Sequence, residues 1–167
     1  MKTQHSVLAL LMLATMGQAR ADSATIDVTG KVLPGTCTMA NVPVALDGID
    51  AVDLGTGGEH GLKPAVLSFT GCVGVTSVEL TFDGTADATQ DGHWQNLSTG
   101  GATGVAVALL DGTTGNVFLK KGATKAVTIN GAATGRLDMR TGYYRKAGTL
   151  LKAGDVSSQI TVTADYK

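Results

Sequence analysis

The chain has 167 residues, with 13 basic and 14 acidic side chains and a formal net charge of −1 at pH 7. This length fits one domain, and the near-neutral charge argues against a nucleic acid or an anionic membrane surface as a partner. Glycine is about twice as frequent as usual, with 23 residues, whereas proline occurs only three times. The composition therefore excludes a collagen-like chain or a disordered linker and favours many short strands joined by turns.

The first 21 residues have the form of a secretory signal peptide. Lys2 gives a positive start, residues 7–16 are apolar, and Ala19-Arg20-Ala21 has the small-x-small pattern of a cleavage site. We predict cleavage between Ala21 and Asp22. An uncleaved anchor is the competing interpretation, although the apolar run is shorter than the ~20 residues that a membrane-spanning helix needs.

Two cysteines remain after this segment is removed, Cys37 and Cys72. A secreted chain with an even number of cysteines is most simply explained by a disulfide, with two free thiols as the alternative. A metal site is not expected, because there is no C-x-x-C motif and only His60 and His93 remain as imidazole ligands. We expect no cofactor either.

The mature chain begins with an extended pattern. Apolar or small residues alternate with polar ones over residues 24–32, and Pro34-Gly35 then interrupts the run. Extended structure is predicted to resume at residues 37–44, and the glycine-rich residues 47–63 read as a loop. The residues that share the apolar face of the first segment are Ala24, Ile26, Val28, Gly30 and Val32.

The middle of the chain contains further short strands. The polar residues 85–104 read as a surface connection that holds the single tryptophan, Trp94, and Asn130-Gly131 is a hairpin-type pair. Outside the signal peptide, no segment has a sustained helical period, so the pattern predicts an all-β sandwich. The predicted strands cover residues 65–72, 75–82, 104–110, 116–119, 126–129 and 137–144.

The last segment, residues 154–167, is a strand with one apolar face. Val156, Ser158, Ile160, Val162, Ala164 and Tyr166 alternate with polar residues. About six core strands are predicted from Cys37 onward, one fewer than in a simple immunoglobulin-type sandwich. No later residues can pair with the last strand, and an open edge must be covered. Residues 24–32 have the right pattern and no local partner, so we predict that they serve a neighbouring molecule.

At this point the chain resembles the pilin subunits of chaperone-usher fimbriae over essentially its whole mature length. The resemblance rests on Gly30 seven residues before Cys37, on Cys72 at the end of a strand, on the penultimate Tyr166, and on Gly154, the fourteenth residue from the end. It implies an immunoglobulin-like sandwich that lacks one strand and is completed by a donor strand from another chain, which is a known form of β-augmentation.

The resemblance also implies partners and site residues. The expected partners are neighbouring pilin subunits, a periplasmic chaperone and an outer-membrane usher, in a cell-surface fimbria that supports cell adhesion. The implied division is a signal peptide at residues 1–21, a donor-strand extension at 22–36 and a pilin domain at 37–167. The implied acceptor groove, also recognised by the chaperone, contains Gly154, Val156, Ile160, Val162, Ala164 and Tyr166.

Alternatives remain for these residues. Gly30 could mark a bulge or a bend, and the apolar face of the last strand could belong to the core of a complete sandwich. Ala24 is small and Ser158 is polar, so their contacts could be weak or wet. The main rival function is a secreted carbohydrate-binding β-sandwich, which would have to bind sugar without a stacking platform because only 4% of residues are aromatic. His93 beside Trp94 could form a sugar-binding patch, but a partly buried Trp that anchors a loop is the commoner case. No catalytic motif is present, and we predict no enzyme. Asn96-Leu97-Ser98 also fits a glycosylation sequon.

Overall fold

The computed structural model describes residues 24–167. The chain divides into two compact units, and the boundary between them in the sequence lies between Lys31 and Val32. The described part of the first unit, residues 24–31, forms no strand, and all of its residues are exposed. Residues 24–167 form no helix, so this range holds no helical segment that could cross a bilayer.

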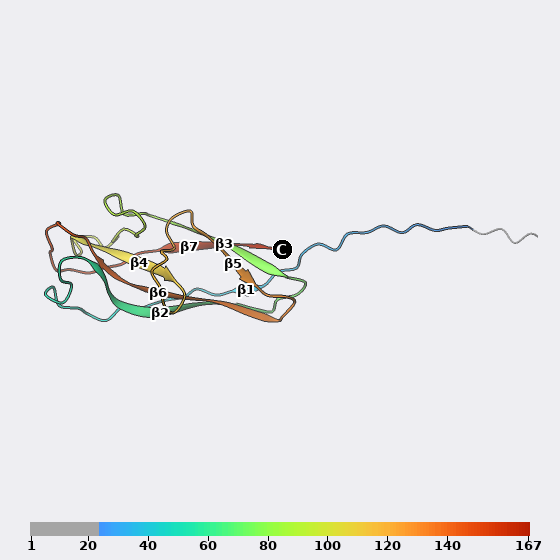
Figure 1. The fold of residues 1–167 in the computed structure, drawn as a ribbon, viewed down its shortest axis with the longest axis horizontal. Coiled ribbons are helices and arrows are strands. Elements are labelled where there is room, and N and C mark those ends of the chain that lie inside the picture. The colour runs from blue at the N-terminus through green and yellow to red at the C-terminus, as the bar shows by residue number, and fades with distance from the viewer. Residues whose placement is uncertain (1–23) are drawn as a thin grey trace, which may run out of the picture. The chain divides into compact units, whose positions relative to one another are not determined.

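The second unit is built from two antiparallel sheets (Figure 1). This confirms the prediction of an all-β fold. The larger sheet has the order β1-β2-β6-β4, and the smaller sheet has the order β5-β3-β7. The strands are β1 (Thr38–Met39), β2 (Gly58–Thr70), β3 (Ser77–Gly84), β4 (Val105–Asp111), β5 (Thr124–Thr128), β6 (Thr134–Arg145) and β7 (Ile160–Tyr166).

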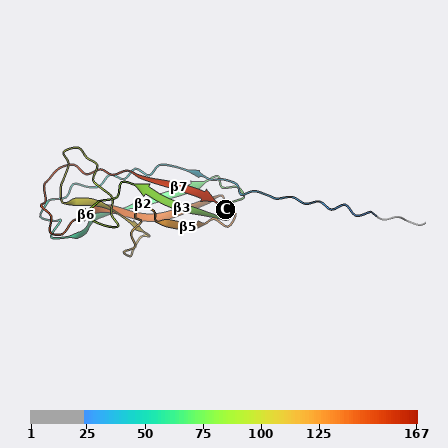
Figure 2. The same cartoon turned by 90° about the horizontal axis from the view of Figure 1, so that it is seen from above.

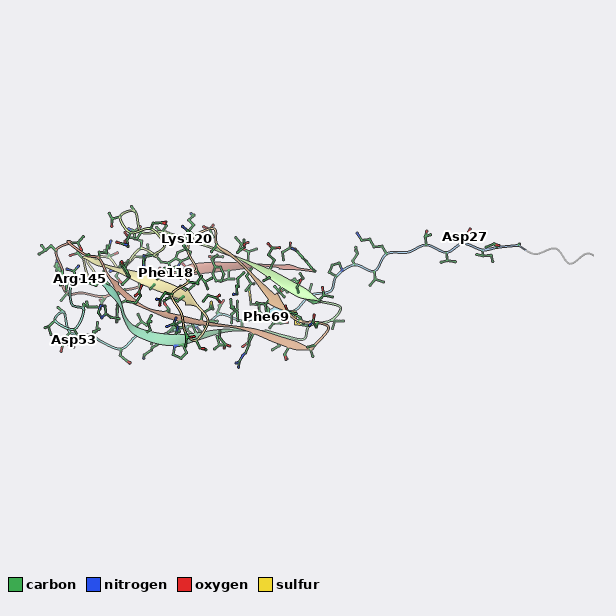
Figure 3. The ribbon with its side chains drawn as sticks, viewed as in Figure 1. Asp27, Asp53, Phe69, Phe118, Lys120 and Arg145 are labelled. Atoms are coloured by element: carbon green, nitrogen blue, oxygen red, sulfur yellow. A yellow bond between two sulfur atoms is a disulfide. The ribbon has the colours of Figure 1, made fainter. Side chains whose placement is uncertain are left out.

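The core consists of the inward-facing residues of both sheets. Phe69 of β2 (labelled in Figure 3) and Leu80 and Phe82 of β3 are fully buried, as the alternation of their strands predicts. Trp94 is fully buried as well, and its indole Nε1 donates a hydrogen bond to the carbonyl oxygen of Leu119 at 3.0 Å. The connection around Trp94 is therefore anchored in the core and is not a purely superficial loop.

A disulfide joins Cys37 to Cys72, which confirms the predicted pairing. Just before Cys37, the backbone of Gly35 lies directly against that of Val73. A Cβ atom at position 35 would lie 1.5 Å from the carbonyl oxygen of Val73, so only glycine fits there. The amide of Gly35 donates to Gly74, and the amide of Val73 donates to Thr36. The chain is thus already attached to the sandwich before the disulfide.

β2 is longer than predicted. It begins at Gly58, inside the glycine-rich segment that the sequence indicated as a loop. The pairing of β2 with β6 shifts register between His60 and Lys63, and Gly58 and Gly61 have φ angles of 100° and 60°. These glycines allow an irregular strand to continue where the pattern indicated a break.

Two other features differ from the sequence reading. Asn130 and Gly131 do form a tight turn, with φ angles of 52° and 74°, but they connect β5 to β6, which lie in different sheets. β4 is buried on both faces, apart from its last residue, Asp111. The backbone of Trp94 exchanges two hydrogen bonds of 2.8 Å with Val107, and Leu119 donates to Leu109, so the outer edge of β4 is closed.

Candidate functional site

A groove of about 660 Å³ opens between the edges of the two sheets. One wall consists of Met39, the last residue of β1, and the residues that follow it up to Leu46. The other consists of residues 156–162, which include the start of β7. Figure 2 shows β7 beside β3, its one partner within residues 24–167. The floor of the groove is formed by core side chains from both sheets: Ala65, Leu67, Phe82, Val107, Leu109 and Met139.

The backbone of β7 has one paired edge and one open edge. Ser77 and Lys167 exchange two hydrogen bonds, from Ser77 N to Lys167 O at 3.2 Å and from Lys167 N to Ser77 O at 2.9 Å. In an antiparallel ladder such doubly bonded pairs recur at every second residue, so Asp165, Thr163 and Thr161 also direct their peptide groups toward β3. The peptide groups of the residues between them point to the open edge. These residues are Ile160, Val162, Ala164 and Tyr166.

The same four residues direct their side chains inward. Along β7 half-buried residues alternate with exposed ones, and Ile160, Val162, Ala164 and Tyr166 are the half-buried set that packs against the core. Because side chains and peptide groups alternate with the same period, one set of residues presents both apolar surface and unpaired backbone groups to the groove. This combination can accept another strand.

The opposite wall is also largely unpaired. β1 pairs with β2 only through Thr38 with Thr70 and Met39 with Phe69, and residues 40–46 belong to no strand. At this end Tyr166 closes the groove, because its hydroxyl donates a hydrogen bond to the carbonyl oxygen of Cys37 at 3.0 Å. The groove thus has a closed end at Tyr166 and an end flanked by Val156.

The sequence-predicted acceptor residues are placed in three ways. Val156, Ile160 and Val162 line the groove, and Ala164 and Tyr166 lie further along the same face. Ser158 also lines it, and its buried hydroxyl oxygen has no hydrogen-bond partner among residues 24–167. Gly154 is exposed and precedes the wall; a Cβ atom there would lie 2.7 Å from the amide nitrogen of Ala102. Glycine at this position lets the backbone of residue 154 pack closely against that of Gly101 and Ala102.

The sequence-predicted donor residues present an exposed apolar face. Ile26, Val28 and Val32 are 86%, 88% and 96% exposed, and no other atom of the described residues lies within 4 Å of a Cβ built on Gly30. Ala24 is exposed as well. The predicted cleavage residues Ala21 and Asp22 lie outside the described residues.

His93 and Trp94 do not form the surface patch that a sugar-binding module would need. The ring of His93 is buried, with centroids 3.6 Å from Tyr144 and 4.6 Å from Phe118. Burial lowers the pKa of His93, although the bond between its Nδ1 and the carbonyl oxygen of Asp91 and the nearby carboxylates oppose this shift. Since Trp94 is fully buried too, neither ring can stack on a ligand.

Two parts of the site were not found from the sequence. The wall at residues 39–46 was read only as extended chain, and the loop at residues 96–102, which contacts residues 155–157, was read as a surface connection. Residues 39–46 are mostly apolar, and their sequence indicates extended chain without showing that it stays unpaired. Residues 96–102 are polar and include Gly100 and Gly101, so they give no periodic signal. No group of three or more potential metal-ligating side chains occurs within residues 24–167.

The fold and the groove define an immunoglobulin-like sandwich with an open edge, and comparison with known proteins identifies its family. The family model for fimbrial proteins matches residues 26–167. The chain is 33% identical to the S-fimbrial adhesin protein SfaS of Escherichia coli (strain 536), over 99% of both chains. It is 31% identical to the protein FimG of Escherichia coli (strain K12), over 74% of this chain and 73% of FimG.

Among solved structures, the P pilus rod subunit PapA has a similar fold, with a TM-score of 0.61 at 15% identity. That match covers 80% of this chain and all of the PapA chain. The chain therefore belongs to the fimbrial protein family. It is a structural subunit of a pilus, the surface fibre that such subunits build after passage through the periplasm.

Proposed function

We propose that this subunit polymerises by donor-strand exchange, in which residues 24–32 of one pilin fill the groove of the next. The observation that carries the proposal is the arrangement of β7. Ile160, Val162, Ala164 and Tyr166 direct both apolar side chains and peptide groups without a partner in residues 24–167 to the same side of β7, where Ile160 and Val162 line the groove. A donor strand with one apolar face meets both demands at once. The contact is head-to-tail, so it builds a filament.

The place where a subunit's own extension joins its sandwich, here called the entry point, favours one direction for the donor strand in the groove. Gly35 and Thr36 are attached to Gly74 and Val73, at the same end of the sandwich as the contact between Tyr166 and Cys37. A donor strand antiparallel to β7 brings its own subunit to the opposite end, beside Val156. This direction leaves the entry point free for the next joint.

The order of side chains in the extension fits this direction. With an antiparallel donor, the small Ala24 lies at the end that Tyr166 closes, and Val32 lies near Val156 in the open hollow. Burial of Ile26, Val28 and Val32 contributes roughly 1.5 to 3 kcal/mol each. Each new main-chain hydrogen bond adds ~0.5 to 1.5 kcal/mol. The joint is therefore expected to dissociate very slowly.

We propose the remaining steps of the pathway from the family. A signal peptidase cleaves between Ala21 and Asp22, and a periplasmic chaperone then occupies the groove until an outer-membrane usher exchanges it for a donor strand. In this division residues 22–36 are the extension and residues 37–167 are the acceptor domain. SfaS is named as an adhesin, and we propose that the fibre containing this subunit likewise supports cell adhesion.

Deletion of residues 22–30 tests the central proposal. The truncated subunit is expected to bind a synthetic peptide of residues 22–34 and to remain a single subunit in size-exclusion chromatography. The full mature chain is expected to form fibres when the chaperone is removed. A matched pair of substitutions isolates the face: Val28→Asp should block extension, whereas Thr29→Asp, on the polar face, should not. Polymerisation of the truncated subunit would show that the extension is not the connector.

A further inference from the structure

The wall of the groove extends beyond the sheet that supports it. β3 ends at Gly84, which is paired with Ile160, the first residue of β7. Val156 and Ser158 nevertheless line the groove, although no strand pairs with them within residues 24–167. Some other element must hold these residues in an extended conformation.

The side chain of Asn96 supplies this support. Its Oδ1 accepts hydrogen bonds from the amides of Ser157 at 3.0 Å and Ser98 at 3.1 Å. Its Nδ2 donates to the carbonyl oxygens of Asp155 and Ala102, both at 3.0 Å. A side-chain amide has two donor hydrogens and one acceptor oxygen with two lone pairs, so Asn96 uses its whole hydrogen-bonding capacity here.

The main chain next to Asn96 continues the same pattern. The amide of Leu97 donates to Ser157 at 2.7 Å, and the amide of Ala102 donates to Asp155 at 2.9 Å. Asp155 and Ser157 therefore direct these peptide groups to the loop, as Thr161 and Thr163 direct theirs to β3. By the alternation of an extended chain, Val156 and Ser158 face the groove. The backbones approach closely, since a Cβ atom on Gly101 would lie 2.3 Å from the carbonyl oxygen of Asp155.

We propose that Asn96 is a positioning residue of the acceptor groove, which replaces β3 beyond Gly84 and presents Val156 and Ser158 to the donor strand. This inference rests on donor-strand exchange as the function. It adds that the end of the donor that carries Val32 depends on Asn96, whereas the end that carries Ile26 does not. The side-chain nitrogen of Asn96, which glycosylation would modify, is used in two hydrogen bonds within the subunit. The inference therefore gives the sequon at residues 96–98 a structural role.

Asn96→Asp tests the inference with little change of shape. The carboxylate can still accept from Ser157 and Ser98, but its second oxygen faces the carbonyl oxygens of Asp155 and Ala102 and cannot donate. The control is Asn116→Asp, which makes the same charge change at an exposed position outside the groove. Both variants are made in the subunit without residues 22–30, and dissociation of peptides of residues 22–34 is measured.

The expected result is a difference between the two ends of the donor. Asn96→Asp should speed dissociation of the unchanged peptide about tenfold relative to Asn116→Asp, because two hydrogen bonds are lost. The same factor is expected for a peptide with Ile26→Ala. With Val32→Ala the factor should shrink to about threefold or less, since the contact that Asn96 supports is already lost. A purely structural role would affect all three peptides equally, and that outcome would overturn the inference.

Two further outcomes separate the inference from the proposed function. If the subunit without residues 22–30, carrying no other substitution, does not bind the peptide at all, the proposal of donor-strand exchange is wrong. If it captures the peptide and Asn96→Asp changes nothing, only the role of Asn96 is wrong. Hydrogen exchange on the unaltered subunit does not depend on how the variants fold: the amide of Ser157 should be protected before any peptide is added. Rapid exchange at Ser157 would contradict the proposed support.

Discussion

Tyr166 connects the end of one groove wall to the start of the other. Its ring is half-buried and its hydroxyl donates to the carbonyl oxygen of Cys37. The sequence placed Tyr166 only on the apolar face of the last predicted strand. The structure shows what holds it, and this contact sets the position where the groove closes.

Tyr166→Phe should lower the free energy of unfolding of the peptide-complemented subunit by about 1 kcal/mol, because it removes one partly buried hydrogen bond. Urea unfolding followed by circular dichroism measures this change. Tyr143→Phe is the matched control: its hydroxyl donates to Asp47 at 2.9 Å in an exposed contact, so its loss should cost less. An equal or larger loss for Tyr143→Phe would contradict the role assigned to Tyr166.

His93 makes stability depend on pH. Burial lowers the pKa of its ring in the folded state, and Glu59, Asp87 and Asp91 are the charged groups that oppose this shift. The unfolded chain therefore binds the proton more readily. The contribution is fully present above the ordinary pKa of about 6.5 and is lost progressively as the pH falls below it.

We expect the free energy of unfolding of the peptide-complemented subunit to fall between pH 7.5 and pH 5.5. His93→Phe keeps an aromatic ring between Tyr144 and Phe118 and removes the titrating group. In this variant the fall should be clearly smaller. Denaturant unfolding at the two pH values provides the measurement, and an unchanged fall in the variant would assign the effect to another group.

At the scale of the element, β7 separates two kinds of backbone contact on alternate residues. The amide of Val162 points to the open edge, and that of Thr163 points to β3. A proline is tolerated in a strand where its missing N–H is not needed by a partner. Adjacent positions should therefore respond in opposite ways.

Val162→Pro should leave the peptide-complemented subunit folded but speed dissociation of the donor peptide about tenfold beyond Val162→Ala, because one ladder bond is lost as well as the side chain. Thr163→Pro should abolish the soluble complex by breaking the ladder with β3. Peptide dissociation rates and the yield of soluble complex give the readout. Equal behaviour of Val162→Pro and Val162→Ala would show that the open edge does not bond to the donor.

The sequence predicted the inward face of β7 and the disulfide, because strict alternation and an even number of cysteines are visible without the fold. It predicted a strand over residues 154–167, but the structure forms one only at Ile160–Tyr166, since β3 ends at Gly84 opposite Ile160. It did not reveal how far β2 extends, since Gly58 and Gly61 look like turn residues until a bulge is seen. Asn130 and Gly131 predicted the turn but not that it crosses between sheets. The support from Asn96 depends on contacts with residues about sixty positions later, which no local pattern encodes.

At the scale of the whole molecule, we propose that residues 37–167 lack one strand and that residues 22–36 supply it to the next subunit. Joining residues 22–36 through a flexible linker after Lys167 should therefore give a self-complemented monomer, provided that the original extension is deleted. We expect this protein to unfold at a higher denaturant concentration than the subunit with bound peptide, because the donor is at high effective concentration. Sedimentation and urea unfolding test the result; fibres of this protein would contradict the proposal.

The disulfide has a mechanical consequence for a fibre under tension. A pull on the extension enters the sandwich at residues 35–37, where β1 contributes only two ladder pairs. Such a short strand would peel away under load. The bond from Cys37 to Cys72 instead passes the force to the end of β2, which pairs with β6 over most of its thirteen residues. In a pilus under tension, the disulfide therefore transfers the load to the ladder between β2 and β6, the longest in the described part of the subunit.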